Sequence, residues 1–509
     1  MRRLTAHPSR RSLLQAALAA GAAPFFIRHA LAADAPRFGL GVASGFPAPD
    51  GMVLWTLITG DGLAPQVSVD WELAEDEGFA RIVARGREWA VEQDAYSVHA
   101  EPARLKPDRW YWYRFTALGQ QSAVGRTRSA PARGAAVDRL RFAIASCQRF
   151  DHGRFAAWAD FARRDHDLML YLGDYIYESA TPADSQAPRR HDGPRCQTLA
   201  DYRRRYAQYK VDPHLQAAHA RLPWIVIWDD HDIENDWAAD VSMYLTPHFE
   251  RQRAAAAKAY WEHLPFPKSR RPDAYAMLIN ERHDWGRLAR IITVDDRSWR
   301  DPQVCPKPGK AGSNTVSASA CPEVLDPGRT LLGAAQESWL RNQWDENRPW
   351  NLLAQQTLMA GLNWEKDSSA PPTVWTDGWD GYPGARQRLL TDLAARQLPN
   401  AVVLGGDVHA NYVADLKLAE AGPIIATEFC GTSITSTGLA QSRLDAALPH
   451  NPQLHYGRSD EHGYMSFDLK PGGLAVELRK VREIWRDDSE VDTAARFFVE
   501  AGKPGAERA

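Results

Sequence analysis

The chain has 509 residues, which is too long for one ordinary hydrophobic core, so we expect two domains. Its formal net charge is −3, and residues 1–32 hold five arginines and no acidic residue, so the remainder carries −8. Proteins that bind nucleic acid in general gain affinity by neutralising phosphates, so we do not expect general nucleic-acid binding here.

The N-terminus has the pattern of an export signal. Arg10 and Arg11 stand in a Ser-Arg-Arg-Ser-Leu-Leu run, an alanine-rich apolar stretch follows, and Ala-Leu-Ala at 30–32 offers a small-residue cleavage site. The alternative is a membrane anchor, but the stretch is short and weakly hydrophobic for a span. We therefore predict a twin-arginine (Tat) signal peptide over residues 1–32, with the Tat export machinery as a partner. The mature protein is expected without a transmembrane anchor, in the periplasm or secreted.

Residues 33–130 are predicted to form an all-β domain. Polar and apolar residues alternate at 67–73, and 110–115 is a run of strand-forming aromatic residues. A turn sequence, Ala-Pro-Asp-Gly, stands at 48–51. Several short strands within about a hundred residues are typical of a β-sandwich. Residues 128–138 are the expected linker.

From residue 138 to 509 the pattern changes to strand-like runs that alternate with helical ones. The strand-like runs are 140–145, 168–172, 225–228, 289–294 and 401–404, and the helical ones are 153–164, 199–221, 246–263, 334–346 and 383–397. This alternation predicts an α/β or α+β catalytic domain.

Three strand-like runs end in groups that bind metals. Asp174 follows one run, Asp407 and His409 follow another, and Asp-Asp-His-Asp at 229–232 follows a third. In open α/β sheets, ligands bind outside the carboxyl ends of the strands. One Gly-Asp after a strand could equally be a turn or a helix N-cap. Three such motifs, with carboxylates that repel each other unless cations neutralise them, favour a metal site.

The five cysteines allow a disulfide and leave a free thiol. Cys305 and Cys321 bracket a loop rich in Pro, Gly and Ser, so we expect them to pair. An odd number of cysteines leaves at least one thiol unpaired. Cys147 is the candidate of interest because it stands just after a predicted strand, although a plain buried thiol is the alternative.

Together these motifs resemble the PhoD-type alkaline phosphatases, a branch of the calcineurin-like metallophosphatases. The resemblance covers nearly the whole chain. It rests on Ser-Cys-Gln at 146–148, Gly-Asp-Tyr-Ile-Tyr-Glu at 173–178, Trp-Asp-Asp-His at 228–231, Trp-Asp-Gly-Tyr-Pro at 379–383, Gly-Asp-Val-His at 406–409 and Glu-Phe-Cys-Gly-Thr-Ser at 428–433.

The resemblance implies a set of metal ligands. Cys147 and Tyr177 match iron ligands of the family, and Asp174 matches a carboxylate that bridges metals. Asp407 and His409 match further ligands. The cofactors implied are Fe³⁺ and Ca²⁺. Thiolate, phenolate and imidazole suit ferric iron, and hard carboxylates suit calcium.

The same resemblance suggests residues that meet the substrate. Asp230 takes the place of a metal-binding residue, with Asp229 as the alternative, and His231 matches a catalytic, substrate-facing histidine. Arg297 is the candidate substrate-binding residue. Asp296 beside it replaces the threonine that is more usual in the family, which could change the preference for negatively charged substrates.

The function implied is that of an exported, metal-dependent phosphoesterase. It would hydrolyse phosphate esters with a metal-activated water and release inorganic phosphate. A phosphodiesterase or phospholipase D-like enzyme of the same family is the near alternative. The distant one is a non-catalytic envelope protein whose β-domain binds a partner, but the intact set of repelling carboxylates argues against it.

The C-terminal residues 491–501 are predicted to form a lid helix. Their apolar residues recur at helical spacing, namely Val491, Ala494, Ala495, Phe497, Phe498 and Ala501. The alternative is an ordinary terminal helix. The resemblance favours a lid, because PhoD-type enzymes can close the active site with C-terminal structure.

Overall fold

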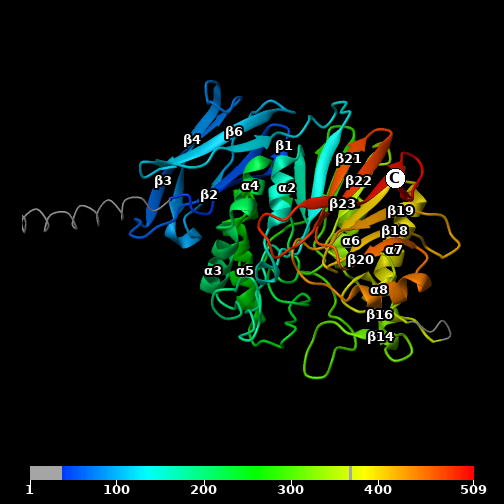
Figure 1. Ribbon diagram of the computed structural model, residues 1–509. Coiled ribbons are helices and arrows are strands. Elements are labelled where there is room, and N and C mark those ends of the chain that lie inside the picture. The colour runs from blue at the N-terminus through cyan, green and yellow to red at the C-terminus, as the bar shows by residue number, and fades with distance from the viewer. Residues whose placement is uncertain (1–36, 366–369) are drawn as a thin grey trace, which may run out of the picture.

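The computed structural model describes residues 37–365 and 370–509. The predicted signal peptide lies outside the described residues. Within them, no helix combines the length and the apolar character that crossing a bilayer requires. Two large sheets stand near the middle of the molecule, with helices on their outer sides (Figure 1).

The N-terminal region is built from antiparallel strands in two sheets, as a β-sandwich requires. One sheet holds β3 (Gln66–Ala74), β4 (Ile82–Val91), β6 (Trp110–Ala117), β7 (Gln120–Gln121) and β8 (Gly125–Arg128). The other consists of β1 (Val42–Ala48), β2 (Gly51–Leu57) and β5 (Ser97–Ala100). Side chains such as Leu54 from one sheet and Phe115 from the other share one hydrophobic core.

This sandwich is joined to the following region through hydrogen bonds. Strand β1 pairs in parallel with β11 (Trp224–Val226), where Gly45 lies opposite Trp224. The β1–β2–β5 sheet is therefore one end of a ten-stranded sheet. The rest of that sheet contains β9 (Leu140–Ala145), β10 (Leu168–Tyr171), β21 (Gly463–Lys470), β22 (Gly473–Val481), β23 (Val491–Glu500) and β24 (Glu507–Arg508).

The second large sheet has seven strands and faces the first. It consists of β12 (Glu281–Trp285), β13 (Ala289–Thr293), β15 (Trp350–Ala354), β17 (Ala401–Gly405), β18 (Asn411–Leu416), β19 (Ala426–Cys430) and β20 (Leu454–Arg458). Phe142 and Met169 of the first sheet share a core with Ile291 and Leu404 of the second. Ile292 points the opposite way, into another core. This alternation along β13 is expected of a strand buried on both faces.

Helices cover the outer faces of the two sheets (Figure 1). On the side of the ten-stranded sheet lie α2 (Ala156–Arg163), α3 (Leu199–Lys210), α4 (Pro213–Arg221) and α5 (Phe249–His263). On the side of the seven-stranded sheet lie α6 (Ala334–Arg341), α7 (Pro383–Arg396) and α8 (Gln441–Ala447). The short strands β14 (Thr315–Ser317) and β16 (Thr373–Trp375) form a separate antiparallel pair.

The single helix expected over 199–221 is two helices. Helix α3 begins with a capping box, in which Thr198 and Asp201 each accept a backbone hydrogen bond from the other. Helix α4 begins at Pro213 after the N-cap Asp212. Proline lacks an amide hydrogen, so it suits the first turn of a new helix and cannot continue an old one.

The predicted C-terminal lid helix is wrong, because residues 491–500 form strand β23. This strand lies between β22 and β24, with Phe497 opposite Val476. Ala495, Phe497 and Val499 are buried, while Phe498 is 39% exposed. The segment therefore has the two-residue period of a strand with one buried face, and none of its residues lines the active-site cavity described below.

Candidate metal-dependent active site

The predicted site residues meet where strands of the two large sheets end. Cys147 follows β9, Asp174 follows β10, and Asp407 follows β17. A parallel bridge between Ser146 and Ser433 and a hydrogen bond from the Ile434 amide to the Ser146 carbonyl (3.0 Å) tie the two sheets together there. The ends of strands from the two large sheets therefore lie next to one another and bring their terminal residues together.

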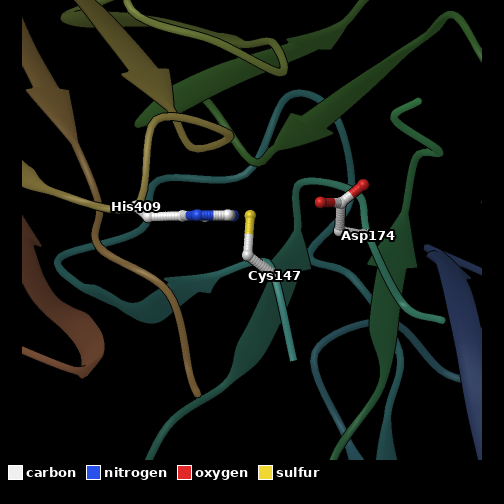
Figure 2. A group of neighbouring side chains, drawn as sticks. All are labelled: Cys147, Asp174 and His409. Carbon is white, nitrogen blue, oxygen red and sulfur yellow. The ribbon is translucent and has the colours of Figure 1, made fainter. Parts of the chain in front are cut away.

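Cys147, Asp174 and His409 form the first group of close ligand atoms. One ligand atom of each residue lies within 4.8 Å of the others. Figure 2 shows the Cys147 sulfur between the His409 ring and Asp174. All three residues have a left-handed backbone, with φ between 51° and 58°. Such a conformation is costly for residues other than glycine and persists where the surrounding structure enforces it, often at functional sites.

Gly173 allows the turn before Asp174 to pass close to the next strand end. Its φ is 107°, and a Cβ there would stand 2.3 Å from the Cβ of Asp229. Only glycine fits this approach. The Asp232 carboxylate strengthens the same contact, because it accepts hydrogen bonds from the amides of Asp174 (2.8 Å) and Asp229 (3.0 Å). Asp232 thus holds two loops of the site together.

Asp230 is shared by three further groups of close ligand atoms. These are Asp174–Asp230–His231, Asp229–Asp230–Asp407 and Asp230–Asp236–Asp377, each with ligand atoms within 4.8 Å of one another. Asp230 lines the cavity, whereas one oxygen of Asp229 is bonded to Arg297. Both oxygens of Asp230 accept backbone hydrogen bonds, from His231 (2.9 Å) and Asp236 (2.8 Å), so Asp229 and Asp230 both stay candidate ligands.

The donor set fits cations. Oδ2 of Asp174, of Asp229 and of Asp407 is buried without a hydrogen-bond partner among the described residues. Burial and the Asp230 carboxylate raise the pKa of Asp174 well above its usual value. Burial and the Asp229 carboxylate do the same to the pKa of Asp407. Buried carboxylates of this kind are stable as anions only beside positive charge.

Tyr177 and His409 are held as a pair beside Cys147. The Tyr177 hydroxyl lies 3.0 Å from Nε2 of His409 and accepts a hydrogen bond from the Ser436 hydroxyl (2.7 Å). Nδ1 of His409 lies 3.0 Å from the Thr437 carbonyl, to which it donates, so Nε2 is left to act as an acceptor or ligand. Burial lowers the pKa of His409 to about 3, which keeps the ring neutral.

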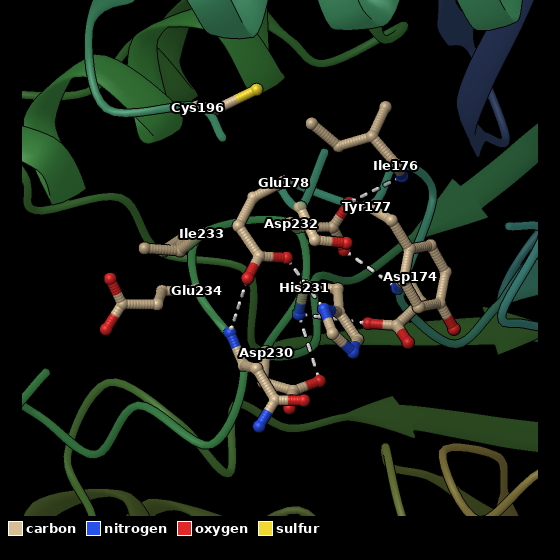
Figure 3. A network of polar contacts seen from close by, with 12 residues as sticks. Asp174, Ile176, Tyr177, Glu178, Cys196, Asp230, His231, Asp232, Ile233 and Glu234 are labelled. Carbon is tan, nitrogen blue, oxygen red and sulfur yellow. Dashed lines mark hydrogen bonds and ion pairs between the residues drawn. The ribbon is translucent and has the colours of Figure 1, made fainter. Parts of the chain in front are cut away.

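His231 faces the cavity and is anchored by Glu178, which the sequence did not single out. Oε2 of Glu178 is 2.7 Å from Nδ1 of His231, and the Asn235 amide donates to Oε1 (3.3 Å) (Figure 3). Burial opposes the charge on His231, but the carboxylates of Glu178 and Asp230 raise its pKa well above the usual value. The pattern that could have revealed Glu178 is its place at the end of the Gly-Asp-Tyr-Ile-Tyr-Glu run.

Arg297 does not lie where a substrate-binding residue would. It is fully buried and does not line the cavity. Its Nε is 2.6 Å from Oδ1 of Asp229, and its Nη1 is 2.7 Å from Oδ2 of Asp377. The structure therefore makes Arg297 a counter-charge behind the acidic cluster. The sequence prediction of direct substrate contact is not supported, because it assumed that the arginine was accessible.

Cys305 and Cys321 are joined by a disulfide. They pack with Val316 and Val324 in a small separate core under the loop that they close. The other three cysteines, which include Cys147, are free and buried.

The acidic cluster predicts an unusual pH dependence for the metal-free protein. Burial raises the pKa of Asp229 to about 7, and it also raises the pKa values of Asp174 and Asp407 well above their usual range. Groups whose pKa is raised by folding stabilise the fold below their unfolded pKa near 4 and lose that contribution as the pH rises. Asp230 has a lowered pKa of about 2, so its contribution to stability is lost only as the pH falls below about 4.

We therefore expect the melting temperature of chelator-treated protein to fall between pH 5 and pH 8. The metal-loaded protein should show a much smaller slope, since bound cations keep the carboxylates ionised throughout. Calorimetry of both forms across this range is the measurement. Parallel slopes for the two forms would contradict a cation-neutralised cluster.

Comparison with known proteins agrees with this geometry. The family model of the PhoD-like phosphatase matches residues 142–478, and that of the PhoD-like phosphatase N-terminal domain matches residues 22–131. The chain is 37% identical over 486 residues to alkaline phosphatase D of Bacillus subtilis (strain 168), which covers 92% of this chain and 82% of the relative.

A solved structure of PhoD superposes on this chain with a TM-score of 0.88. The two share 37% identity, and the match covers 94% of this chain and 92% of the other. The resemblance seen in the motifs is thereby confirmed over both sheets and the N-terminal sandwich. The chain is an enzyme of the PhoD-like phosphatase family.

Proposed function

We propose that the protein is an exported, metal-dependent phosphoesterase that hydrolyses phosphate esters to an alcohol and inorganic phosphate. One observation supports this above the others. Buried carboxylates from separate strand ends, with unpartnered oxygens, converge on one cavity beside a thiol, a phenol and a neutral imidazole. The name of the Bacillus relative, alkaline phosphatase D, supports the same reaction.

The residues divide into two kinds of ligand. The softer donors that suit Fe³⁺ come from Cys147, Tyr177 and His409. Asp174 belongs both to the group with Cys147 and His409 and to a group with Asp230. Asp230 and Asp407 offer the hard oxygens that suit Ca²⁺. When bound, such cations neutralise the charge of a phosphate ester and acidify water for in-line attack.

His231 is the residue proposed to meet the substrate. It lines the cavity, and its Nδ1 is committed to Glu178, so Nε2 is free to donate to a phosphate or leaving-group oxygen. The backbone amide of His231 also donates to Asp174 Oδ1 (3.1 Å) and Asp230 Oδ1 (2.9 Å). The histidine is therefore positioned by the same carboxylates that would hold the cations.

The first prediction concerns the bridging carboxylate. Asp174→Asn keeps the shape but removes the charge, so hydrolysis of 4-nitrophenyl phosphate should fall by about a hundredfold or more, with less bound metal by elemental analysis. Asp165→Asn, on a surface carboxylate that pairs with Arg141, is the matched control and should behave as wild type. Full activity with full metal content in Asp174→Asn would sink the assignment.

The second prediction distinguishes a catalytic role of His231 from a role in metal binding. Glu178→Gln retains a hydrogen-bond acceptor but loses the charge that supports protonated His231, so kcat should fall about 10- to 100-fold while the metal content stays constant. The control is Glu234→Gln, a buried carboxylate that pairs with Arg195. Unchanged kcat in Glu178→Gln, or a loss of metal that matches the loss of activity, would argue against this role.

The third prediction concerns export. Tat substrates fold before they cross the membrane, so the cytoplasm would determine which metals enter. Replacing both Arg10 and Arg11 by Lys should retain the active protein inside the cell, as fractionation and immunoblotting would show. The matched control replaces Arg2 and Arg3 by Lys and should export normally. Normal export of the Arg10 and Arg11 variant would refute the proposal.

A further inference from the structure

The active-site cavity extends well beyond the metal-ligand candidates. Its volume is about 450 Å³, within the range of sites that enclose a drug-sized organic molecule. We call its extension the aromatic arm, lined by Leu358, Leu362, Trp364, Trp375, Leu439 and Arg443. The phosphate chemistry described above does not use these residues.

The two tryptophans of the arm are held in place by the backbone. The Trp364 amide donates to the Thr373 carbonyl (3.0 Å), and the Thr373 amide donates to the Asn363 side chain (3.0 Å). Trp375 ends strand β16 and is paired with Thr315 of β14. Both tryptophans are partly exposed, so the arm presents aromatic surfaces on a backbone that is already hydrogen-bonded.

Arg443 lies at the same end of the cavity. Its guanidinium stands 4.9 Å from the centre of the Trp364 ring, and helix α8 carries it. Among the described residues, no carboxylate lies within ion-pair distance of this guanidinium. The lining therefore combines the acidic candidate metal ligands with an aromatic group beside a positive charge.

We propose that the aromatic arm binds the organic group of the phosphate ester, and that the group it fits best is a planar aromatic one the size of a nucleoside. A flat ring stacks on indole and guanidinium surfaces. A flexible alkyl group would gain only apolar contact and would lose rotamer entropy. This inference rests on the proposed function. Water would add to phosphorus, and the P–O bond to the nucleoside would break, with the alcohol leaving in protonated form.

The test compares two esters on the full-length, metal-loaded protein. For wild type, Trp364→Leu and Trp375→Leu, kcat/KM is measured with adenosine 5′-monophosphate and with glycerol 2-phosphate. In both variants the ratio of the first to the second should fall about tenfold, and Trp364→Phe should restore most of it. Trp89→Leu is the matched control, since Trp89 is 55% exposed on strand β4 and does not line the cavity.

Two results would overturn the inference: an unchanged ratio, which includes equal losses for both esters, or a loss for hexyl phosphate as large as that for adenosine 5′-monophosphate. Adenosine binding, followed by saturation-transfer NMR, separates the arm from the chemistry. If wild type hydrolyses neither ester but binds adenosine, and this binding is lost in Trp364→Leu, the result supports the inference about the aromatic arm and contradicts the proposed function. If both esters are hydrolysed and adenosine does not bind, only the inference about the aromatic arm is contradicted.

Discussion

Repulsion between buried carboxylates is the constraint on which the site depends. Asp174, Asp230 and Asp407 approach one another at strand ends around one cavity, with Arg297 buried behind them and Arg300 paired with the neighbouring Asp377. Two guanidiniums cannot neutralise all the carboxylates grouped there, so the remaining charge must be removed by protons or by cations. The proposed chemistry follows if cations neutralise the cluster, because the same cations attract the negative charge of a phosphate ester.

The fold makes this crowding achievable. Parallel strands place their carboxyl ends at one edge of a sheet, and two sheets packed face to face bring two such edges together. At these strand ends Cys147, Asp174, Asp407 and His409 all have positive φ, a costly conformation for residues other than glycine. The N-terminal sandwich extends one of the sheets through β1, so it is part of the frame that carries these strand ends.

Local patterns predicted several strands and the candidate ligands that follow them, because a buried strand and its terminal turn are both encoded by neighbouring residues. Long-range features were not predictable in this way. The apolar residues of 491–500 fit a helical period as well as a strand, and only pairing with β22 decides between them. Asp377 stands just before the Trp-Asp-Gly-Tyr-Pro run at 379–383, but no local pattern predicts that it meets Asp230 after folding. Arg297 looked like a substrate contact because its burial could not be read from the sequence.

The central proposal is that Cys147, Tyr177 and His409 would bind Fe³⁺ next to a cation held by carboxylates. Anomalous diffraction at the iron absorption edge, from crystals of the exported and active protein, tests it most directly. The account predicts a strong anomalous peak within bonding distance of the Cys147 sulfur and the Tyr177 oxygen. A fully active crystal with no iron peak beside these two atoms would contradict it.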